Sequence, residues 1–377
     1  MSSSTTDAPA SANASAIARP RPLAAPVTAA TRPCKENMSK AIIALDPSKV
    51  CNLPGRHLAT RCLRCQMFAF ISMTCCNATN ASDFSAVEKS ARHELQGVHF
   101  FYRGPDDLGQ NKRRQATTMA HEEAFETVTG CRIRVMRKGR GEPLLFLHGA
   151  SGASRWLPFM DQLAESFDVI VPEHPGFGAS ETPDWLDNVG DLAWFYLDVI
   201  DHLGLSGVHL VGTSIGGWIA AELATRSCAK LRSLTLVAPA GIHVPGVRRG
   251  DMFMWSPEEL ARNLFHDPAL AAAMPQPASE EELMVVLKNR LTTAKLGWSP
   301  RFHNPHLKKW LHRICVPTMI VWGDDDKLIP AEHGPAYRDL IPGASLQVIS
   351  ACGHLPHVEQ AAEFTACVAN FLRGAAR

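Results

Sequence analysis

One serine in this chain of 377 residues is placed so that its hydroxyl could act as a nucleophile. Ser214 lies between Gly212 and Gly216, directly after the apolar run 208–211 and before the helical pattern 215–225. Glycines at these two positions permit the close chain approach of a sharp strand-to-helix turn, which holds a serine hydroxyl above the sheet. The N-terminus of the following helix favours negative charge that develops there. A phosphate-binding glycine turn is the other interpretation, but the lysine of a phosphate-binding loop is absent from the motif.

A serine hydroxyl needs a general base near neutral pH, and histidine is the side chain whose ordinary pKa suits that task. The chain has 16 histidines, so the candidate must be chosen by its position. His354 follows the last apolar run, 346–349, in a loop that can return over the nucleophile, and we predict it as the base. His357 is expected to begin the final helix as a surface or capping residue. The remaining histidines are expected to be structural or solvated.

The base in turn needs a carboxylate that fixes its tautomer and stabilises its cation. Three consecutive aspartates, Asp324, Asp325 and Asp326, follow the apolar run 318–322. Adjacent like charges repel one another, so we expect at most one of them to be buried against the histidine. The residue types alone do not decide which one it is.

Backbone N–H groups that stabilise an oxyanion are expected in the small-residue loop after the apolar run 144–147. We predict Ala150 as the first donor, with Ser151 as the next choice. The second donor is predicted to be Ile215, the residue after the nucleophile. His148, which opens the loop, is interpreted as a structural anchor and not as a catalytic residue.

The elements that must position these residues follow a regular alternation of short apolar runs and longer amphipathic stretches. The later runs are nearly continuous and β-branched, as in parallel strands that are covered on both faces. This alternation predicts an α/β fold with a doubly wound, mostly parallel sheet. Strands are expected at 131–136, 144–147, 169–171, 208–211, 234–237, 318–322 and 346–349, and helices at 191–203, 215–225 and 364–372.

The alternation is interrupted between residues 237 and 317, where helical patterns occur without a good strand. Ser256 and Ser279 each precede a group of acidic residues and are expected to cap helices. We interpret residues 241–312 as a helical insertion over the carboxyl edge of the sheet, which is where open α/β sheets bind ligands. The apolar run 252–255 either lines an acyl pocket or packs the insertion on the sheet.

The first 118 residues differ in composition from the rest. Residues 2–33 consist mainly of Ser, Thr, Ala and Pro, which predicts disorder. They superficially match a transit peptide, but several prolines interrupt any amphipathic helix. Cys62 and Cys65 form a C-x-x-C pair, which is weak evidence for zinc because a structural site needs four ligands. We expect either a disordered extension or an over-extended start, with Met119 opening a catalytic domain at 119–377.

Composition excludes several other classes of function. A formal net charge of +1 gives no basic footprint for nucleic acid. The sequence contains no run of 18 or more apolar residues, so a membrane span is not expected. The 11 cysteines show no pairing pattern, which favours free thiols and a cytoplasmic location. No metal and no organic cofactor are implied, and the oligomeric state is left open.

Four blocks of this sequence resemble the α/β-hydrolase superfamily, in the family's order between about residues 130 and 372. They are the loop at His148-Gly149, the segment Pro175-Gly-Phe-Gly-Ala-Ser180, the elbow around Ser214, and the acid and base blocks. The family pattern W-G-x-x-D-x-x-x-P implies that Asp326 is the acid, and G-H-x-P-x-x-E implies that His354 is the base. The chain order Ser, Asp, His is that of the family. The resemblance also implies a helical cap domain at the insertion.

The resemblance leaves the substrate open. A serine nucleophile disfavours the haloalkane dehalogenases and epoxide hydrolases, which use aspartate. The Ser-x-Gly-Gly turn at Ser214 resembles that of carbon–carbon hydrolases acting on aromatic ring-cleavage products, but these usually carry tryptophan after the catalytic histidine, where this chain has Leu355. We therefore expect hydrolysis of a small apolar carboxylic ester through an acyl-enzyme. The alternatives are carbon–carbon hydrolysis of a vinylogous diketone and a non-catalytic binding protein on the same scaffold.

Overall fold

The apolar runs form an eight-stranded sheet in the computed structural model, which describes residues 120–375. The strand order is β1-β2-β4-β3-β5-β6-β7-β8. The first two strands pair antiparallel with their neighbours, and all pairs from β4 and β3 onward to β8 are parallel. The predicted α/β fold with a mostly parallel sheet is therefore confirmed. The strands are β1 Glu122–Val128, β2 Cys131–Lys138, β3 Glu142–Leu147, β4 Phe167–Pro172, β5 Val208–Thr213, β6 Leu231–Val237, β7 Thr318–Gly323 and β8 Ser345–Ile349.

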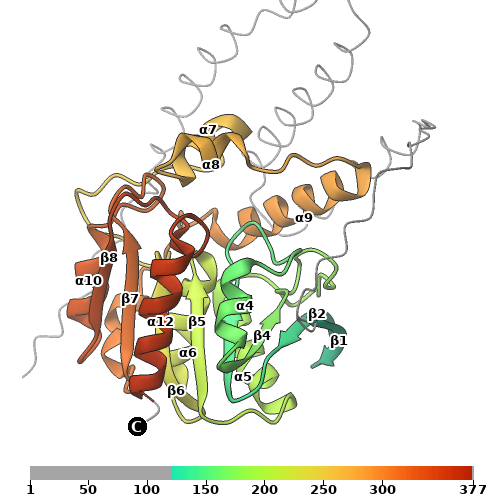
Figure 1. Ribbon diagram of the computed structural model, residues 1–377, viewed down its shortest axis with the longest axis vertical. Helices are drawn as coiled ribbons and strands as arrows, with labels where there is room; N and C mark the ends of the chain where they lie inside the picture. The colour runs from blue at the N-terminus through green and yellow to red at the C-terminus, as the bar shows by residue number, and fades with distance from the viewer. Residues whose placement is uncertain (1–119, 376–377) are drawn as a thin grey trace, which may run out of the picture. The chain divides into compact units, whose positions relative to one another are not determined.

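Helices cover both faces of the sheet and create two separate apolar layers (Figure 1). Helices α4 (Pro158–Ala164) and α12 (Ala361–Ala375) lie on one face. Helices α5 (Val189–His202), α6 (Ile215–Arg226) and α10 (His333–Leu340) lie on the other. Successive residues of β3 alternate between the two layers, as the pleat of a strand requires. This double coverage explains why the central strands are apolar along their whole length.

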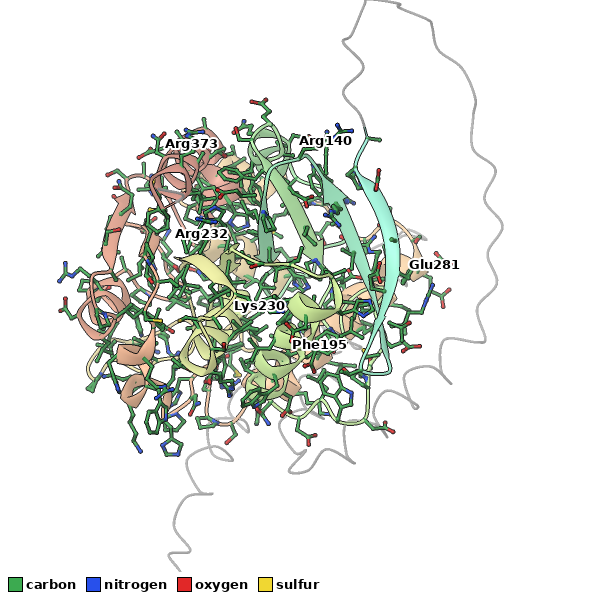
Figure 2. The ribbon with its side chains drawn as sticks, turned by 90° about the horizontal axis from the view of Figure 1, so that it is seen from below. Arg140, Phe195, Lys230, Arg232, Glu281 and Arg373 are labelled. Carbon is green, nitrogen blue, oxygen red and sulfur yellow. The ribbon has the colours of Figure 1, made fainter. Side chains whose placement is uncertain are left out.

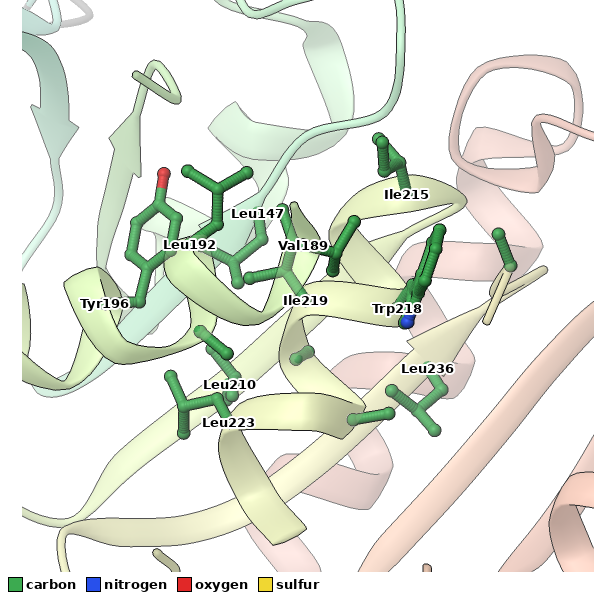
Figure 3. Close-up of a cluster of buried hydrophobic side chains, with 14 of the residues drawn as sticks. Leu147, Val189, Leu192, Tyr196, Leu210, Ile215, Trp218, Ile219, Leu223 and Leu236 are labelled. Atoms are coloured by element: carbon green, nitrogen blue, oxygen red, sulfur yellow. The ribbon is translucent and has the colours of Figure 1, made fainter. Parts of the chain in front are cut away.

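Helix α6 is fixed by an apolar cluster beneath it (Figure 3). Ile219 and Leu223 extend from the helix toward Leu210 of β5, and all three side chains are fully buried. Leu192 and Tyr196 of the neighbouring helix α5 belong to the same cluster. Because α6 is packed along its length, its first turn has a defined position at the end of β5.

The insertion between β6 and β7 contains helices and no named strand in the described chain. Helices α7 (Pro257–Leu264), α8 (Pro268–Ala272) and α9 (Glu280–Gly297) lie together above the sheet in Figure 1. Two short 3₁₀ helices, η2 (Leu307–Lys309) and η3 (Leu311–Arg313), lead to β7. The predicted caps are confirmed, because the Ser256 and Ser279 side chains accept hydrogen bonds from the first turns of α7 and α9.

The opposite end of the molecule is seen in Figure 2. Arg140, Lys230, Arg232 and Arg373 lie there, away from the helical insertion. Lys230 pairs with Asp201, and Arg232 pairs with Glu142 at 3.2 Å. Within residues 120–375, no helix combines the length and apolar character needed to cross a membrane. The same residues contain no group of three or more His, Cys, Asp and Glu side chains arranged to hold a metal ion.

Several elements differ from the sequence-based prediction. Strand β1, which was not predicted, joins β2 through a two-residue turn in which Thr129 and Gly130 both have positive φ. Its residues are mostly exposed, so it lacks the apolar pattern of a buried strand. The predicted extension at residues 1–118, with Cys62 and Cys65, lies outside the described residues. The five cysteines that the structure describes are free thiols.

Matched substitutions in neighbouring strands test the two-layer packing. Val321 of β7 is fully buried, whereas Val348 of β8 is 42% exposed. We expect Val321→Ala to lower the free energy of unfolding by about 2 kcal/mol, since two buried methyl groups are lost and a cavity remains. Val348→Ala should change it by less than about 0.5 kcal/mol. Urea unfolding followed by circular dichroism measures both values, and equal losses would contradict the assigned faces.

Candidate active site

Ser214 occupies a strained turn between β5 and α6. Its φ of 54° and ψ of −115° are conformations that residues other than glycine rarely adopt. A side chain on Gly212 would approach the carbonyl oxygen of Gly216 to 2.4 Å, and one on Gly216 would approach the carbonyl oxygen of Leu147 to 2.2 Å. Both glycines are therefore required by close backbone contacts. The turn has the geometry that the G-x-S-x-G motif predicts, and Ser214 is 9% exposed at its tip.

Asp326 and His354 form a buried pair at the carboxyl end of the neighbouring strands. The Nδ1 atom of His354 lies 2.7 Å from Oδ2 of Asp326, and the residues are 2% and 5% exposed. The other carboxylate oxygen accepts the backbone N–H groups of Leu328 and Ile329 at 2.9 and 2.8 Å. Trp322 donates its indole N–H to Oδ2 at 3.1 Å. Four donors therefore hold the carboxylate in one orientation toward the imidazole.

The structure distinguishes the three consecutive aspartates by their partners. Asp325 pairs with His266 and Lys327, each at 2.9 Å, near the surface. A carboxylate oxygen of Asp324 accepts the backbone N–H of Cys352 at 3.3 Å. Asp326 alone among the three contacts His354 in the described hydrogen bonds. This arrangement agrees with the expectation that one carboxylate at most is buried against the histidine.

The loop that carries His354 is held by the insertion. The backbone N–H of His354 donates to the carbonyl oxygen of Leu264, the last residue of α7, at 2.8 Å. Glu359 accepts the N–H groups of Gly353 at 2.6 Å, of His266 at 3.2 Å and of Asp267 at 2.7 Å. Sequence analysis recognised Glu359 only as part of a family pattern. Its role is to join the histidine loop to the segment between α7 and α8.

The Nε2 atom of His354 is the side of the imidazole that faces away from Asp326. It is buried and has no hydrogen-bond partner among residues 120–375. With Nδ1–H held by the carboxylate, the neutral ring carries its lone pair on Nε2. This lone pair is thus available to accept a proton from a group that reaches the site.

The loop after β3 is fixed by a pair of buried histidines. The backbone N–H of His174 donates to Nε2 of His148 at 2.9 Å, so Nδ1 carries the proton and donates to the carbonyl oxygen of Gly149 at 2.7 Å. Burial lowers the pKa of His148 to about 4, which keeps this imidazole neutral near pH 7. The ring of His174 stacks on it at 3.6 Å between centroids. The interpretation of His148 as a structural anchor agrees with these contacts.

The predicted oxyanion donors lie on two segments that approach each other at the elbow. A side chain on Gly149 would approach Cβ of Ser214 to 3.5 Å, so the loop with Ala150 adjoins the nucleophile. Ile215 is the first residue of α6, where the backbone N–H has no acceptor within its own helix. Ser151, the second choice for a donor, has its carbonyl oxygen bonded to Asn289 of α9 at 2.9 Å. Sequence analysis gave no signal for Asn289, because a single polar residue in a helix is ordinary.

His357 differs from its predicted position. It lies in the short helix α11 (Pro356–Glu359), but it is buried and not a surface or capping residue. Its ring contacts Phe146, Phe159 and Phe364 with centroids 5.2 to 6.1 Å apart. These aromatic neighbours lie in β3, α4 and α12, so a helix-boundary pattern does not reveal the burial.

A family model described as "Alpha/beta hydrolase family" matches residues 144–366. This range is more than half of the chain and contains Ser214, Asp326 and His354. The chain therefore belongs to the alpha/beta hydrolase family, in agreement with the four sequence blocks. The protein is a serine hydrolase of this fold.

Individual relatives differ in the reactions that their names describe. The chain is 30% identical over 262 residues to the dihydrolipoyllysine-residue acetyltransferase component of the acetoin cleaving system of Cupriavidus necator, covering 66% of this chain and 69% of that protein. It is 29% identical over 268 residues to 2-hydroxymuconate semialdehyde hydrolase of a Pseudomonas strain, and the match covers 64% of this chain and 91% of that protein. Among solved structures, an esterase from Thermogutta terrifontis is 26% identical with a TM-score of 0.55, and the match covers 67% of this chain and 99% of the esterase.

The buried His357 predicts how stability depends on pH. Burial, with a smaller contribution from His354, lowers the pKa of His357 to about 3, whereas it is about 6.5 in the unfolded chain. Between these values only the unfolded chain takes up the proton, so stability falls as the pH falls below about 6.5. His357→Leu should remove this loss, amounting to about 2 kcal/mol at pH 5.

Urea unfolding of wild type and His357→Leu at pH 7.5 and pH 5 measures the effect. We expect the two proteins to differ little at pH 7.5, because the Nδ1 atom of His357 has no partner in the described chain and leucine has a similar volume. The variant should be the more stable protein at pH 5. His312→Leu, at an exposed position, is the control. Parallel losses of stability in wild type and His357→Leu would contradict the prediction.

Proposed function

We propose that this protein cleaves a carbon–carbon bond next to a ketone in a vinylogous diketone, through a serine nucleophile. The observation that carries the serine mechanism is the buried Asp326–His354 pair, whose free imidazole nitrogen lies at the same sheet edge as the strained Ser214. Acid, base and nucleophile each follow their own strand. A carboxylate, an imidazole that it orients and a serine hydroxyl are the groups that acyl transfer requires.

The proposed reaction begins with attack of the Ser214 hydroxyl oxygen on the ketone carbonyl. His354 takes the hydroxyl proton on Nε2, and Asp326 stabilises the resulting imidazolium. The tetrahedral oxyanion accepts hydrogen bonds from the N–H groups of Ala150 and Ile215. The carbon–carbon bond then breaks, its electron pair moves into the conjugated carbonyl system, and the leaving carbon takes the proton from His354. Water then attacks the acyl carbon while Nε2 of His354 takes its proton, the ester bond to Ser214 breaks, and the Ser214 oxygen takes that proton as the carboxylic acid leaves.

The choice of a carbon–carbon bond rests on the curated relatives. Several are named as hydrolases of 2-hydroxy-6-oxo dienoates or of 2-hydroxymuconate semialdehyde, and the chain covers 91% or more of their length at 28–29% identity. These matches favour carbon–carbon hydrolysis over the ester hydrolysis expected from the sequence. The Ser-x-Gly-Gly turn, with Gly216 and Gly217 after the serine, points the same way.

Ester hydrolysis is the second candidate, and Leu355 is the observation that favours it. A tryptophan is usual at this position in the carbon–carbon hydrolases, whereas this chain has a partly buried leucine. The esterase of known structure that is 26% identical also supports this candidate. Both reactions pass through the same oxyanion and the same acyl-enzyme, so they differ only in the leaving group.

Replacing the nucleophile tests both candidates together. Ser214→Ala should lower turnover at least about 10³-fold, because the acyl-enzyme cannot form. Turnover is followed by the loss of colour of a 2-hydroxy-6-oxo-6-phenylhexa-2,4-dienoate and by nitrophenol release from p-nitrophenyl esters of graded length. Ser227→Ala, at the far end of α6, is the control and should retain activity.

The substrate panel also decides between the candidates. We expect a higher kcat/KM for the dienoate than for any ester. Turnover of esters alone would favour the second candidate. Turnover of neither, with no labelling by a fluorophosphonate probe, would leave the third hypothesis, a binding protein without catalysis.

Replacing the acid by its amide tests the assignment of Asp326. The N–H groups of Leu328 and Ile329 require an oxygen at their side, so the amide nitrogen of Asp326→Asn must face His354. This would place the ring proton on Nε2 and remove the lone pair that accepts the serine proton. We expect kcat to fall about 10³- to 10⁴-fold. Asp325→Asn is the matched control, and an equal loss in that variant would contradict the assignment.

A further inference from the structure

Asn289 of helix α9 connects two loops at the candidate active site. Its Nδ2 atom donates to the carbonyl oxygen of Ser151 at 2.9 Å, and its Oδ1 atom accepts the backbone N–H of Gly178 at 2.8 Å. The amide orientation is set by these partners, since a carbonyl can only accept and an N–H can only donate. Asn289 is 4% exposed, so both bonds are protected from water.

Two neighbours on α9 bind the second of these loops. Thr292 donates its hydroxyl to the carbonyl oxygen of Gly176 at 2.6 Å. Lys288 donates to the carbonyl oxygens of Gly178 and Ser180 at 2.9 and 2.5 Å. Asn289 in addition extends from this helix to the loop that contains Ala150. This difference separates anchoring of the helix from any effect on the oxyanion loop.

The bond from Asn289 reaches the predicted oxyanion donor through two peptide planes. The carbonyl of Ser151 and the N–H of Gly152 belong to one planar trans peptide and point in opposite directions. The Gly152 N–H donates to the carbonyl oxygen of Gly149 at 3.1 Å. The carbonyl of Gly149 and the N–H of Ala150 belong to a second trans peptide plane. The Ala150 N–H must therefore point in the direction opposite to the Gly149 carbonyl. Asn289 fixes the first plane, and the first plane helps to fix the second.

Gly152 permits the close approach that this arrangement needs. Its φ is +85°, a conformation that favours glycine. A side chain there would lie 2.5 Å from Nδ2 of Asn289. The Gly149 carbonyl has a second fixed partner, the protonated Nδ1 of His148 at 2.7 Å. The peptide that carries the Ala150 N–H is thus held from the core by His148 and from the insertion by Asn289.

We propose that Asn289 is a positioning residue for the oxyanion hole, which it stabilises through the Ser151–Gly152 and Gly149–Ala150 peptides. This inference rests on the proposed serine mechanism. The bond couples the insertion to catalysis, because the residue that orients the donor lies on α9 and not on the sheet. Loss of Asn289 frees one side of the Ser151–Gly152 peptide and leaves the Gly149 carbonyl held by His148 and by the Gly152 N–H, so Ala150 can rotate away from the oxyanion. Loss of a complete oxyanion donor costs about 10²- to 10³-fold in kcat, and a partial loss of orientation should cost about 10- to 100-fold.

The test compares Asn289→Asp with Thr292→Val on the same helix. Asn289→Asp keeps the shape and the acceptor for Gly178 but cannot donate to Ser151 when ionised. Thr292→Val removes a buried hydrogen bond to the other loop only. We expect kcat to fall about 10- to 100-fold in Asn289→Asp with KM within about twofold, whereas Thr292→Val should retain kcat. Circular dichroism and thermal unfolding establish that both variants are folded.

A transition-state analogue supplies the readout that a purely structural role would not change. An aryl trifluoromethyl ketone forms a hemiketal oxyanion with an active serine, whereas the corresponding methyl ketone binds as a ground-state mimic. The inhibition constant for the trifluoromethyl ketone should rise in Asn289→Asp by the same factor as kcat/KM falls. The constant for the methyl ketone should not change. Asn289→Ala, which removes donor and acceptor together, should follow the same relation if the aspartate variant does not fold.

The outcomes separate the two proposals. If the wild type neither turns over substrate nor binds the trifluoromethyl ketone more tightly than Ser214→Ala does, the serine mechanism itself is wrong. If the wild type is active and Asn289→Asp matches Thr292→Val in kcat and in analogue affinity, the positioning role is wrong. An equal rise in the inhibition constants of both ketones would also overturn the positioning role, because that pattern indicates a general loss of binding.

Discussion

The constraint on which the site depends is a backbone contact at the start of α6. Gly216 lies so close to the carbonyl oxygens of Leu147 and His148 that a side chain there would approach them to 2.2 and 2.5 Å. This contact brings the first turn of α6 against the end of β3. The loop after β3 begins at the same point. A single close approach therefore sets the relative positions of Ser214, the N-terminus of α6 and the loop of the predicted donors.

Much of the fold was predictable because its determinants are local in sequence. The central strands are covered on both faces, so they appear as continuous apolar runs, and the helix between β5 and β6 has a glycine-rich start. The strained turn at Ser214 was predictable for the same reason, since it requires glycines at fixed spacing. Strand β1 was not, because it lies at an edge and its residues are mostly exposed.

Features that depend on contacts between distant segments were not predictable from local patterns. The residue types alone do not distinguish the three aspartates; the family pattern points to Asp326, and the contact with His354 comes only from the folded chain. The burial of His357 follows from the packing of Phe159 and Phe364, which lie in two other helices. Asn289 donates a hydrogen bond to Ser151, which is 138 positions away in the chain.

The contacts of Glu359 limit how the insertion could be exchanged in protein engineering. One carboxylate accepts N–H groups from Gly353 beside the base and from His266 and Asp267 between α7 and α8. The backbone of Leu264 adds a direct bond to His354. The insertion is thus not an interchangeable module that merely shapes a pocket. A chimera that exchanges it for the cap of another hydrolase must transplant the groups that face Glu359 and His354 as well, or the recipient scaffold will receive a new specificity together with a displaced base.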